Sequence, residues 1–366
     1  MADFQLAYLE KERGYTADSG TIYLDLPSAE QVSMLMVEFT VSNTSPTSRD
    51  YERTILDVVG KVEVLLAGAK TAYSCCPEVG SYLAWLAAKK VPPHRIRERG
   101  ETTLRLPIYF GRYPFDPEYM LDTSLYPSVQ LQIPYALNTT YETTGSSKLT
   151  VWYARPIDKQ SLKGFVRSRT INTYSSTGSA ETKEIDLPTG LPWHSVGFRA
   201  YDVDCWPSGN VTDVDLDVDQ GRLHLFDGRM EDLISLQQLW FGESVRGNQL
   251  WAMPVSGDYW QTFLGDVEAV HFTSFAASAW MFASSAIYGP SAEIRMVDAD
   301  GNAAVNAVDV YCQAEGSLPY SGVALGYFPD APYAAPLHSD IKIEYTLGAY
   351  TTLLETWLQE IVSGRL

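Results

Sequence analysis

The sequence lacks the features of several protein classes. It has four cysteines and no CxxC pair, so we expect neither a zinc site of that spacing nor a secreted-type disulfide framework. Adjacent Cys75 and Cys76 are typical of a protein made in a reducing compartment. Met1–Gln5 shows no basic segment before an apolar run, so no secretory signal is expected. The longest uncharged stretch, Phe272–Ala292, is diluted by serine and threonine, so no transmembrane helix is expected.

Positive charge is also scarce. The chain has 27 Lys and Arg against 45 Asp and Glu, a net charge of −18. Phosphates repel such a surface, so contact with a genome or an anionic membrane needs a local basic patch. Two basic segments could form a solvated or subunit-facing patch, or one facing a membrane or genome: Lys89, Lys90, Arg95, Arg97, Arg99 and Arg105, and then Lys159, Lys163, Arg167 and Arg169.

Catalytic motifs are missing. No HExxH, GxSxG, P-loop or GxGxxG occurs. Glu184–Leu187 resembles the start of the E-I-D-x-x-E strand of laminarinase-like glycosidases, but Pro188 and Thr189 follow and the second glutamate is absent. We therefore predict no catalytic, cofactor-binding or metal-binding residue and no enzyme activity. The five histidines are scattered singly: His94, His194, His224, His271 and His338.

One acidic pattern leaves a calcium site open. Asp213, Asp215, Asp217 and Asp219 alternate with apolar residues, which places the four carboxylates on one face of a strand, roughly 6.6 Å apart. A flat row does not converge on an ion, so a solvated face is favoured over calcium binding. The segment Asp298–Asn302 resembles a calcium loop only faintly, and we expect an ordinary turn there.

Strand patterns dominate what is present. Short alternating or continuously apolar runs predict strands at Thr21–Leu26, Met34–Val41, Thr103–Phe110, Val129–Tyr135 and Lys148–Tyr153. Helical periodicity is rare. It predicts three helices, at Pro77–Lys90, Gly228–Phe241 and Tyr350–Val362.

The most informative feature is an internal repeat. In each half a strand leads through a glycine turn into a second strand and then a helix, which begins nine residues after the glycine. In the first half the strand is Val62–Leu66, the turn residue is Gly68 and the helix begins at Pro77. In the second half the strand is Val214–Val218, the turn residue is Gly221 and the helix begins at Met230. A second match pairs Pro127–Ile133 with Pro290–Met296. Two matches in the same order predict a duplicated domain.

The repeat and the length of 366 residues define the predicted fold. We expect an all-β chain with a few short helices, built as two consecutive eight-stranded jelly rolls, a double jelly roll. Its predicted parts are an N-terminal arm (1–20), a first jelly roll (21–155), a linker (156–183), a second jelly roll (184–347) and a C-terminal helix (348–366). Residues 297–339 are expected to form a long loop on the outward rim, before Ile341–Tyr345 as the last strand.

The order of elements resembles that of the double jelly-roll major capsid proteins of tailless icosahedral viruses, the tectivirus–adenovirus type. Val62–Lys90 is similar to the strand–turn–strand–helix module of that family's first jelly roll, and Asp213–Phe241 to that of the second. Leu104–Phe110 and Leu131–Tyr135 resemble a pair of neighbouring strands there.

This resemblance implies a structural role. A member of that family forms homotrimeric, pseudo-hexagonal capsomers that tile an icosahedral virion shell, and it is made in the host cytoplasm, here of a bacterium if the virus is a bacteriophage. Its implied partners are itself, neighbouring capsomers and penton or minor capsid proteins, with no small-molecule substrate. High acidity and the lack of a basic N-terminal arm leave contact with an internal membrane or the genome open.

Two other classes also remain open. One is a receptor- or glycan-binding β-sandwich protein, such as a spike or lectin, and the other is a sandwich glycosidase. Aromatic side chains in loops could stack on sugars or be buried between subunits. The candidates are Trp251, Tyr259, Trp260, Tyr320, Tyr327, Phe328 and Tyr333.

Overall fold

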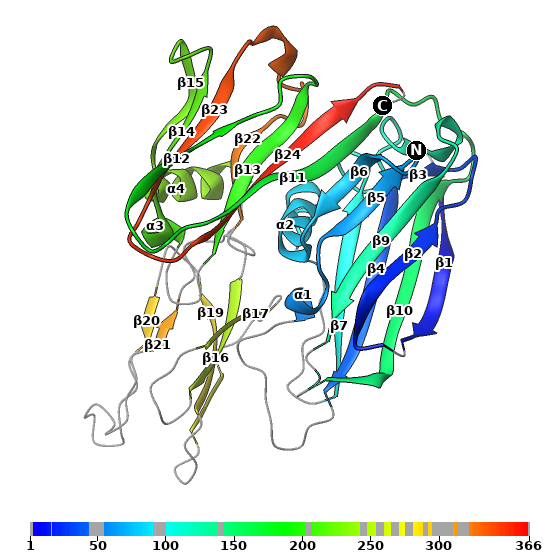
Figure 1. The fold of residues 1–366 in the computed structure, drawn as a ribbon, viewed down its shortest axis with the longest axis horizontal. Coiled ribbons are helices and arrows are strands. Elements are labelled where there is room, and N and C mark those ends of the chain that lie inside the picture. Colours follow the sequence, from blue (N-terminus) through cyan, green and yellow to red (C-terminus); the bar gives the residue numbers. More distant parts are fainter. Residues whose placement is uncertain are drawn as a thin grey trace.

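The fold is that of two β-sandwiches side by side, with both chain termini at the same end (Figure 1). The computed structural model describes residues 3–15, 17–43, 55–90, 92, 100–137, 139, 142–201, 207–241 and 322–364. Between residues 247 and 312 it describes the backbone of six strands. No helix within these described ranges is long and apolar enough to cross a membrane.

The first sandwich consists of two sets of four antiparallel strands. One is a separate sheet in the order β1 (Phe4–Gly14), β10 (Glu142–Pro156), β4 (Met34–Asn43) and β7 (Gly100–Tyr109). The other set has the order β2 (Ser19–Asp25), β9 (Val129–Ala136), β5 (Val62–Leu66) and β6 (Lys70–Cys75). All five strands predicted for this half are confirmed.

The second sandwich repeats this plan. Its first set has the order β11 (Phe165–Ser175), β24 (Leu353–Val362), β13 (Trp193–Tyr201) and β22 (Gly322–Tyr327). Its second set has the order β12 (Glu181–Asp186), β23 (Ile341–Leu347), β14 (Val211–Val218) and β15 (Leu223–Arg229). Each strand has a counterpart at the same place in chain order and sheet order, from β1 and β11 to β6 and β15. The predicted double jelly roll is confirmed.

The hairpin and helix of the repeat occur in both halves. Gly68 and Gly221 have φ angles of 76° and 81°, in the left-handed region that favours glycine. Helix α2 (Pro77–Ala88) follows β6, and helix α4 (Met230–Phe241) follows β15. Helix α4 begins at Met230, as the repeat predicted, and not at Gly228, because Gly228 and Arg229 still pair with β14.

The remaining elements lie around the two sandwiches. Helices α1 (Ile55–Val58) and α3 (Pro207–Asn210) are single turns, as are the 3₁₀ segments Thr123–Leu125 and Ala335–Leu337. Strands β3 (Gln31–Val32) and β8 (Leu121–Asp122) pair with each other. A separate sheet has the order β17 (Trp260–Leu264), β16 (Gly247–Met253), β19 (Met281–Ile287) and β18 (His271–Ser274), and β20 (Ala292–Ile294) pairs with β21 (Val310–Cys312).

Each sandwich has its own apolar core. Residues of β5 alternate between buried and half-buried, and Phe39 on β4 is fully buried in the same cluster as Leu131 on β9. The second core includes Phe198 and Tyr345, whose rings meet edge-on. Trp357 comes from the second half but belongs to the first cluster, so the two cores meet at the junction between the sandwiches.

Three predicted boundaries were wrong because predicted non-sheet segments are strands. The N-terminal arm 1–20 contains β1 and the start of β2, and the linker 156–183 contains β11 and the start of β12. The C-terminal helix predicted at Tyr350–Val362 is instead strand β24, which pairs with β11 and β13 on its two sides. Leu, Glu and Gln favour a helix only weakly, and burial on both faces of a central strand outweighs that preference.

The same plan corrects two other predictions. Strand β9 corresponds to β23, so the match of Pro127–Ile133 with Pro290–Met296 was wrong. The loop predicted at 297–339 contains β22, which pairs with β13 as the edge strand of the eight-stranded sheet. Strand β24 follows Ile341–Tyr345 as the last strand. The expected turn at Asp298–Asn302 lies outside the described residues.

Candidate functional site: the seam between the two jelly rolls

The candidate chemical residues of the sequence can now be placed in the structure, as far as it describes them. No group of three or more His, Cys, Asp or Glu side chains within the described part of the chain could hold a metal ion. Glu184 lies opposite Glu344 in the sheet. The side chains of His94 and His271 lie outside the described residues.

The aspartate row predicted as a solvated face is engaged with nearby donors. Asp215 Oδ1 lies 2.8 Å from His224 Nδ1, and Asp217 accepts a hydrogen bond from the Gly221 backbone N–H. Asp219 Oδ2 lies 2.8 Å from His338 Nδ1, and this contact lowers the pKa of the carboxyl group to about 2. These three carboxylates therefore stabilise a turn and pair with neighbouring histidines.

The described loop aromatics also have partners within the chain. The rings of Phe328 and Tyr333 stack at a centroid distance of 5.3 Å, and Tyr333 stacks on His338 at 5.5 Å. Lys89 lies over the ring of Tyr327 at 4.6 Å. The side chains of Trp251, Tyr259, Trp260 and Tyr320 lie outside the described residues.

The most distinctive arrangement is the junction where the two jelly rolls meet, which we call the seam. Strand β6 of the first roll pairs in parallel with β11 of the second, with Tyr73 opposite Ser168 and Ser74 opposite Arg169. This pairing joins two four-stranded sets into one eight-stranded sheet. The rolls are therefore linked by backbone pairing as well as by the chain connection.

A buried ion cluster crosses the seam beside this pairing. Arg199 Nη1 on β13 donates to Glu355 Oε2 on β24 at 2.9 Å, and its Nη2 lies 3.8 Å from Glu78 of helix α2. The Arg199 and Glu355 side chains are 7% and 8% exposed. Cys76 Sγ donates to the same carboxylate. Burial of charge on this scale is stable only when the partners stay together.

A second buried carboxylate holds the seam strand itself. Glu360 on β24 is 1% exposed and accepts hydrogen bonds from Arg167 and Arg169 of β11 at 2.8 and 2.9 Å. These two cations belong to the second predicted basic segment. Their charge is directed at a buried glutamate, which fixes β11 against β24.

Helix α2 fills the space between the rolls. The Tyr82 hydroxyl donates to Gln237 Oε1 of helix α4 at 3.1 Å, and its ring lies 5.7 Å from that of Trp357. A Cβ atom at Gly322 would collide with the Tyr82 ring, so glycine is required for this close approach. The equivalent helices of the two rolls thus contact each other.

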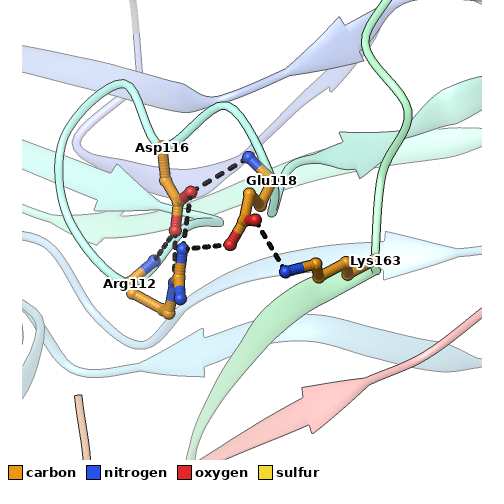
Figure 2. A network of polar contacts seen from close by, with 4 residues as sticks. All are labelled: Arg112, Asp116, Glu118 and Lys163. Carbon is orange, nitrogen blue, oxygen red and sulfur yellow. Dashed lines mark hydrogen bonds and ion pairs between the residues drawn. The ribbon is translucent and has the colours of Figure 1, made fainter. Parts of the chain in front are cut away.

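A polar network fixes the connection between the rolls (Figure 2). The carboxylate of fully buried Asp116 accepts a hydrogen bond from Arg112 Nε at 2.7 Å. The carboxylate of Glu118 accepts hydrogen bonds from Arg112 Nη2 at 2.8 Å and from Lys163 Nζ at 2.6 Å. The hydrogen bond from Lys163 lowers the pKa of Glu118. Backbone bonds from Lys163 to Glu118 and from Met120 to Gly164 complete the attachment.

Sequence reasoning missed the seam. The segment of Glu355 and Glu360 was assigned to a helix, so their burial was not foreseen. A signal was present, because charged residues within apolar strand patterns need buried partners. In the first basic segment, Arg105 pairs with Glu38 at 3.1 Å, and Lys89 lies over the ring of Tyr327. Residues 93–99 of that segment lie outside the described residues.

These features define a class of fold, the double jelly roll in which one sheet runs through both rolls. The predicted pairing of Leu104–Phe110 with Leu131–Tyr135 was wrong in detail, because β7 pairs with β4 while β9 pairs with β2 and β5. No family model matches the sequence, and no curated protein matches it.

Solved structures of the same fold cover the chain from end to end. The major capsid protein of STIV, Sulfolobus Turreted Icosahedral Virus, has a TM-score of 0.57 at 10% identity, covering 99% of this chain and 98% of its own. The PBCV-1 virus capsid structure has a TM-score of 0.52 at 8% identity, covering 100% of this chain and 96% of its own. The major capsid protein P2 from bacteriophage PM2 has a TM-score of 0.50 at 10% identity, covering 99% of this chain and 98% of its own. At these identities the likeness shows the fold.

Proposed function

We propose that this chain is the major capsid protein of an icosahedral virus, with a structural and non-enzymatic role in the virion. Three copies form a pseudo-hexagonal capsomer, and the capsomers tile the shell. The observation that carries the proposal is the seam, which joins two jelly rolls of one plan into a single sheet.

The seam suits a shell subunit for a physical reason. A tile must transmit load between its parts without changing shape, and loosely linked domains move relative to each other by default. Here parallel strand pairing, the Arg199–Glu355 cluster and the Lys163–Glu118 contact all resist such movement. The end-to-end likeness to solved capsid proteins supports the same role.

The proposed partners are further copies of the chain, neighbouring capsomers and penton or minor capsid proteins. Contact with a membrane or genome through the basic segments gains no support from Arg105, Lys163, Arg167 and Arg169, since each is paired with a glutamate. We therefore assign these four cations to holding the fold.

The test is the assembly state of the purified chain. Mass photometry at micromolar concentration is expected to give a species of three times the 40.7 kDa chain, and negative-stain microscopy is expected to show particles of hexagonal outline. A monomer that binds to a glycan array would instead favour the receptor- or glycan-binding alternative. Hydrolysis in a polysaccharide substrate screen would overturn the non-enzymatic assignment.

A further inference from the structure

The seam shows how one jelly roll of this chain attaches to the next. Strand β6 lies at the edge of its four-stranded set, and β11 lies at the edge of the set that follows. The two edges pair in parallel. Because both rolls have the same plan, the chain contains a second edge equivalent to β6, which is β15, and a second edge equivalent to β11, which is β1.

Both equivalent strands lie at outer edges of the sheets that the described residues form. Figure 1 shows them on opposite sides of the molecule, both running away from the end that carries the termini. A second copy that is rotated about an axis along these strands therefore presents the two edges in the direction needed for a parallel pair. An exposed strand edge with unpaired backbone groups is a ready template for pairing with another chain.

Exposure differs between the seam strands and their counterparts. At the seam, Tyr73 and Ser74 of β6 are 3% and 5% exposed. With the turn glycines aligned, their counterparts on β15 are Phe226, which is half-buried, and Asp227, which is exposed. The edge strand β6 of the first roll is thus covered by β11, whereas the equivalent strand β15 of the second roll is exposed.

Strand β1 is also more exposed than its counterpart β11, and its exposed side chains are large and apolar. With the first residues of β1 and β11 aligned, Leu6 and Tyr8 take the places of Arg167 and Arg169. Leu6 is 56% exposed and Tyr8 is 62% exposed, although both are large and apolar. Ala154 takes the place of Glu360, the carboxylate that holds the two arginines. Exposed apolar side chains on an open edge mark an interaction surface.

We propose that β15 of one copy pairs in parallel with β1 of a second copy, in the way that β6 pairs with β11. This inference rests on the proposed capsomer and identifies its contact surface. The seam register places Phe226 opposite Ala7 of the neighbouring copy and Asp227 opposite Tyr8. The contact surface on one side is β1 with Leu6 and Tyr8, and on the other side it is β15.

The pairing has a defined symmetry. Because β15 and β1 are different surfaces, the contact is head-to-tail, and such contacts give either closed rings or open filaments. A ring of three copies contains six jelly rolls joined by alternating internal and external seams. Its outline is pseudo-hexagonal, which agrees with the proposed capsomer.

Site-specific cross-linking tests the contact. Neighbouring strands lie about 4.8 Å apart, which is within the Cα separation that a disulfide spans. The Tyr8→Cys/Asp227→Cys double variant is therefore expected to give covalent dimers and trimers on oxidation. Each single variant serves as the control and is expected to stay monomeric on a non-reducing gel. A trimer by mass photometry without cross-links overturns the pairing but leaves the capsomer standing, whereas absence of any trimer counts against the proposed function itself.

A charge exchange gives an independent result. Tyr8→Glu places a carboxylate opposite Asp227 and is expected to raise the dissociation constant of the trimer about tenfold or more. Tyr8→Glu/Asp227→Lys is expected to restore it. Tyr23→Glu is the matched control, because Tyr23 is a 56% exposed tyrosine on β2, and it is expected to leave assembly unchanged. Loss of assembly without rescue overturns the register.

Discussion

The Tyr82 hydroxyl of helix α2 donates a buried hydrogen bond to Gln237 of helix α4, across the boundary between the two jelly rolls. The two helices follow equivalent hairpins, so this bond joins the same structural unit of each roll to its copy. Both side chains are buried, at 0% and 3% exposure. A polar pair enclosed in this way specifies one relative position of the rolls.

Removing the Tyr82 hydroxyl is expected to weaken the junction. Tyr82→Phe keeps the ring against Trp357 but leaves Gln237 Oε1 without this donor, which costs about 1–3 kcal/mol of unfolding free energy. Urea unfolding followed by tryptophan fluorescence measures the change. Exposed Tyr23→Phe is the control and is expected to be neutral. Equal stability of the two variants would contradict a structural role for the bond.

The Arg199–Glu355 pair is expected to show the larger cost of a broken buried ion pair. Glu355→Gln leaves the 7% exposed arginine without its nearest carboxylate, and the expected loss is about 3–5 kcal/mol. An exposed pair, Arg229 with Asp232 at 3.0 Å, provides the control. Asp232→Asn is expected to leave the free energy of unfolding nearly unchanged, because solvent screens this exposed pair. Similar effects of the two substitutions would argue against the seam cluster as a stabilising element.

These effects explain what the sequence could and could not predict. The turn glycines, the two helices that follow the hairpins and the alternating strands depend on neighbouring residues, and they were predicted correctly. Strand β24 depends on distant partners, because its residues pair with β11 and β13, and so it was assigned to a helix. The seam was missed for the same reason, since Glu360 and its arginine partners are 191 and 193 residues apart.

Acid is expected to destabilise the protein through His194. This side chain is 2% exposed, and burial, together with the nearby Arg112, lowers its pKa from 6.5 to about 4. The unfolded chain therefore binds a proton that the folded chain does not, so stability falls as the pH drops from about 6.5 towards about 4. Asp116 and Lys89 also act on the ring, in opposite directions. His194→Gln is expected to flatten this part of the curve in urea titrations at several pH values. An unchanged slope would contradict the assignment.

The duplicated turns provide the last test, because equivalent positions must respond equally. Gly68 and Gly221 both have a positive φ, and a Cβ atom at either would meet nothing within 4 Å. Gly68→Ala and Gly221→Ala are therefore each expected to cost only the backbone strain, about 1 kcal/mol. Gly322 has no positive φ, but its Cβ would collide with the Tyr82 ring, so Gly322→Ala is expected to cost more than either turn variant. Thermal unfolding of the three variants gives the order. Clearly different costs for Gly68→Ala and Gly221→Ala would show that the two hairpins are not held in the same way.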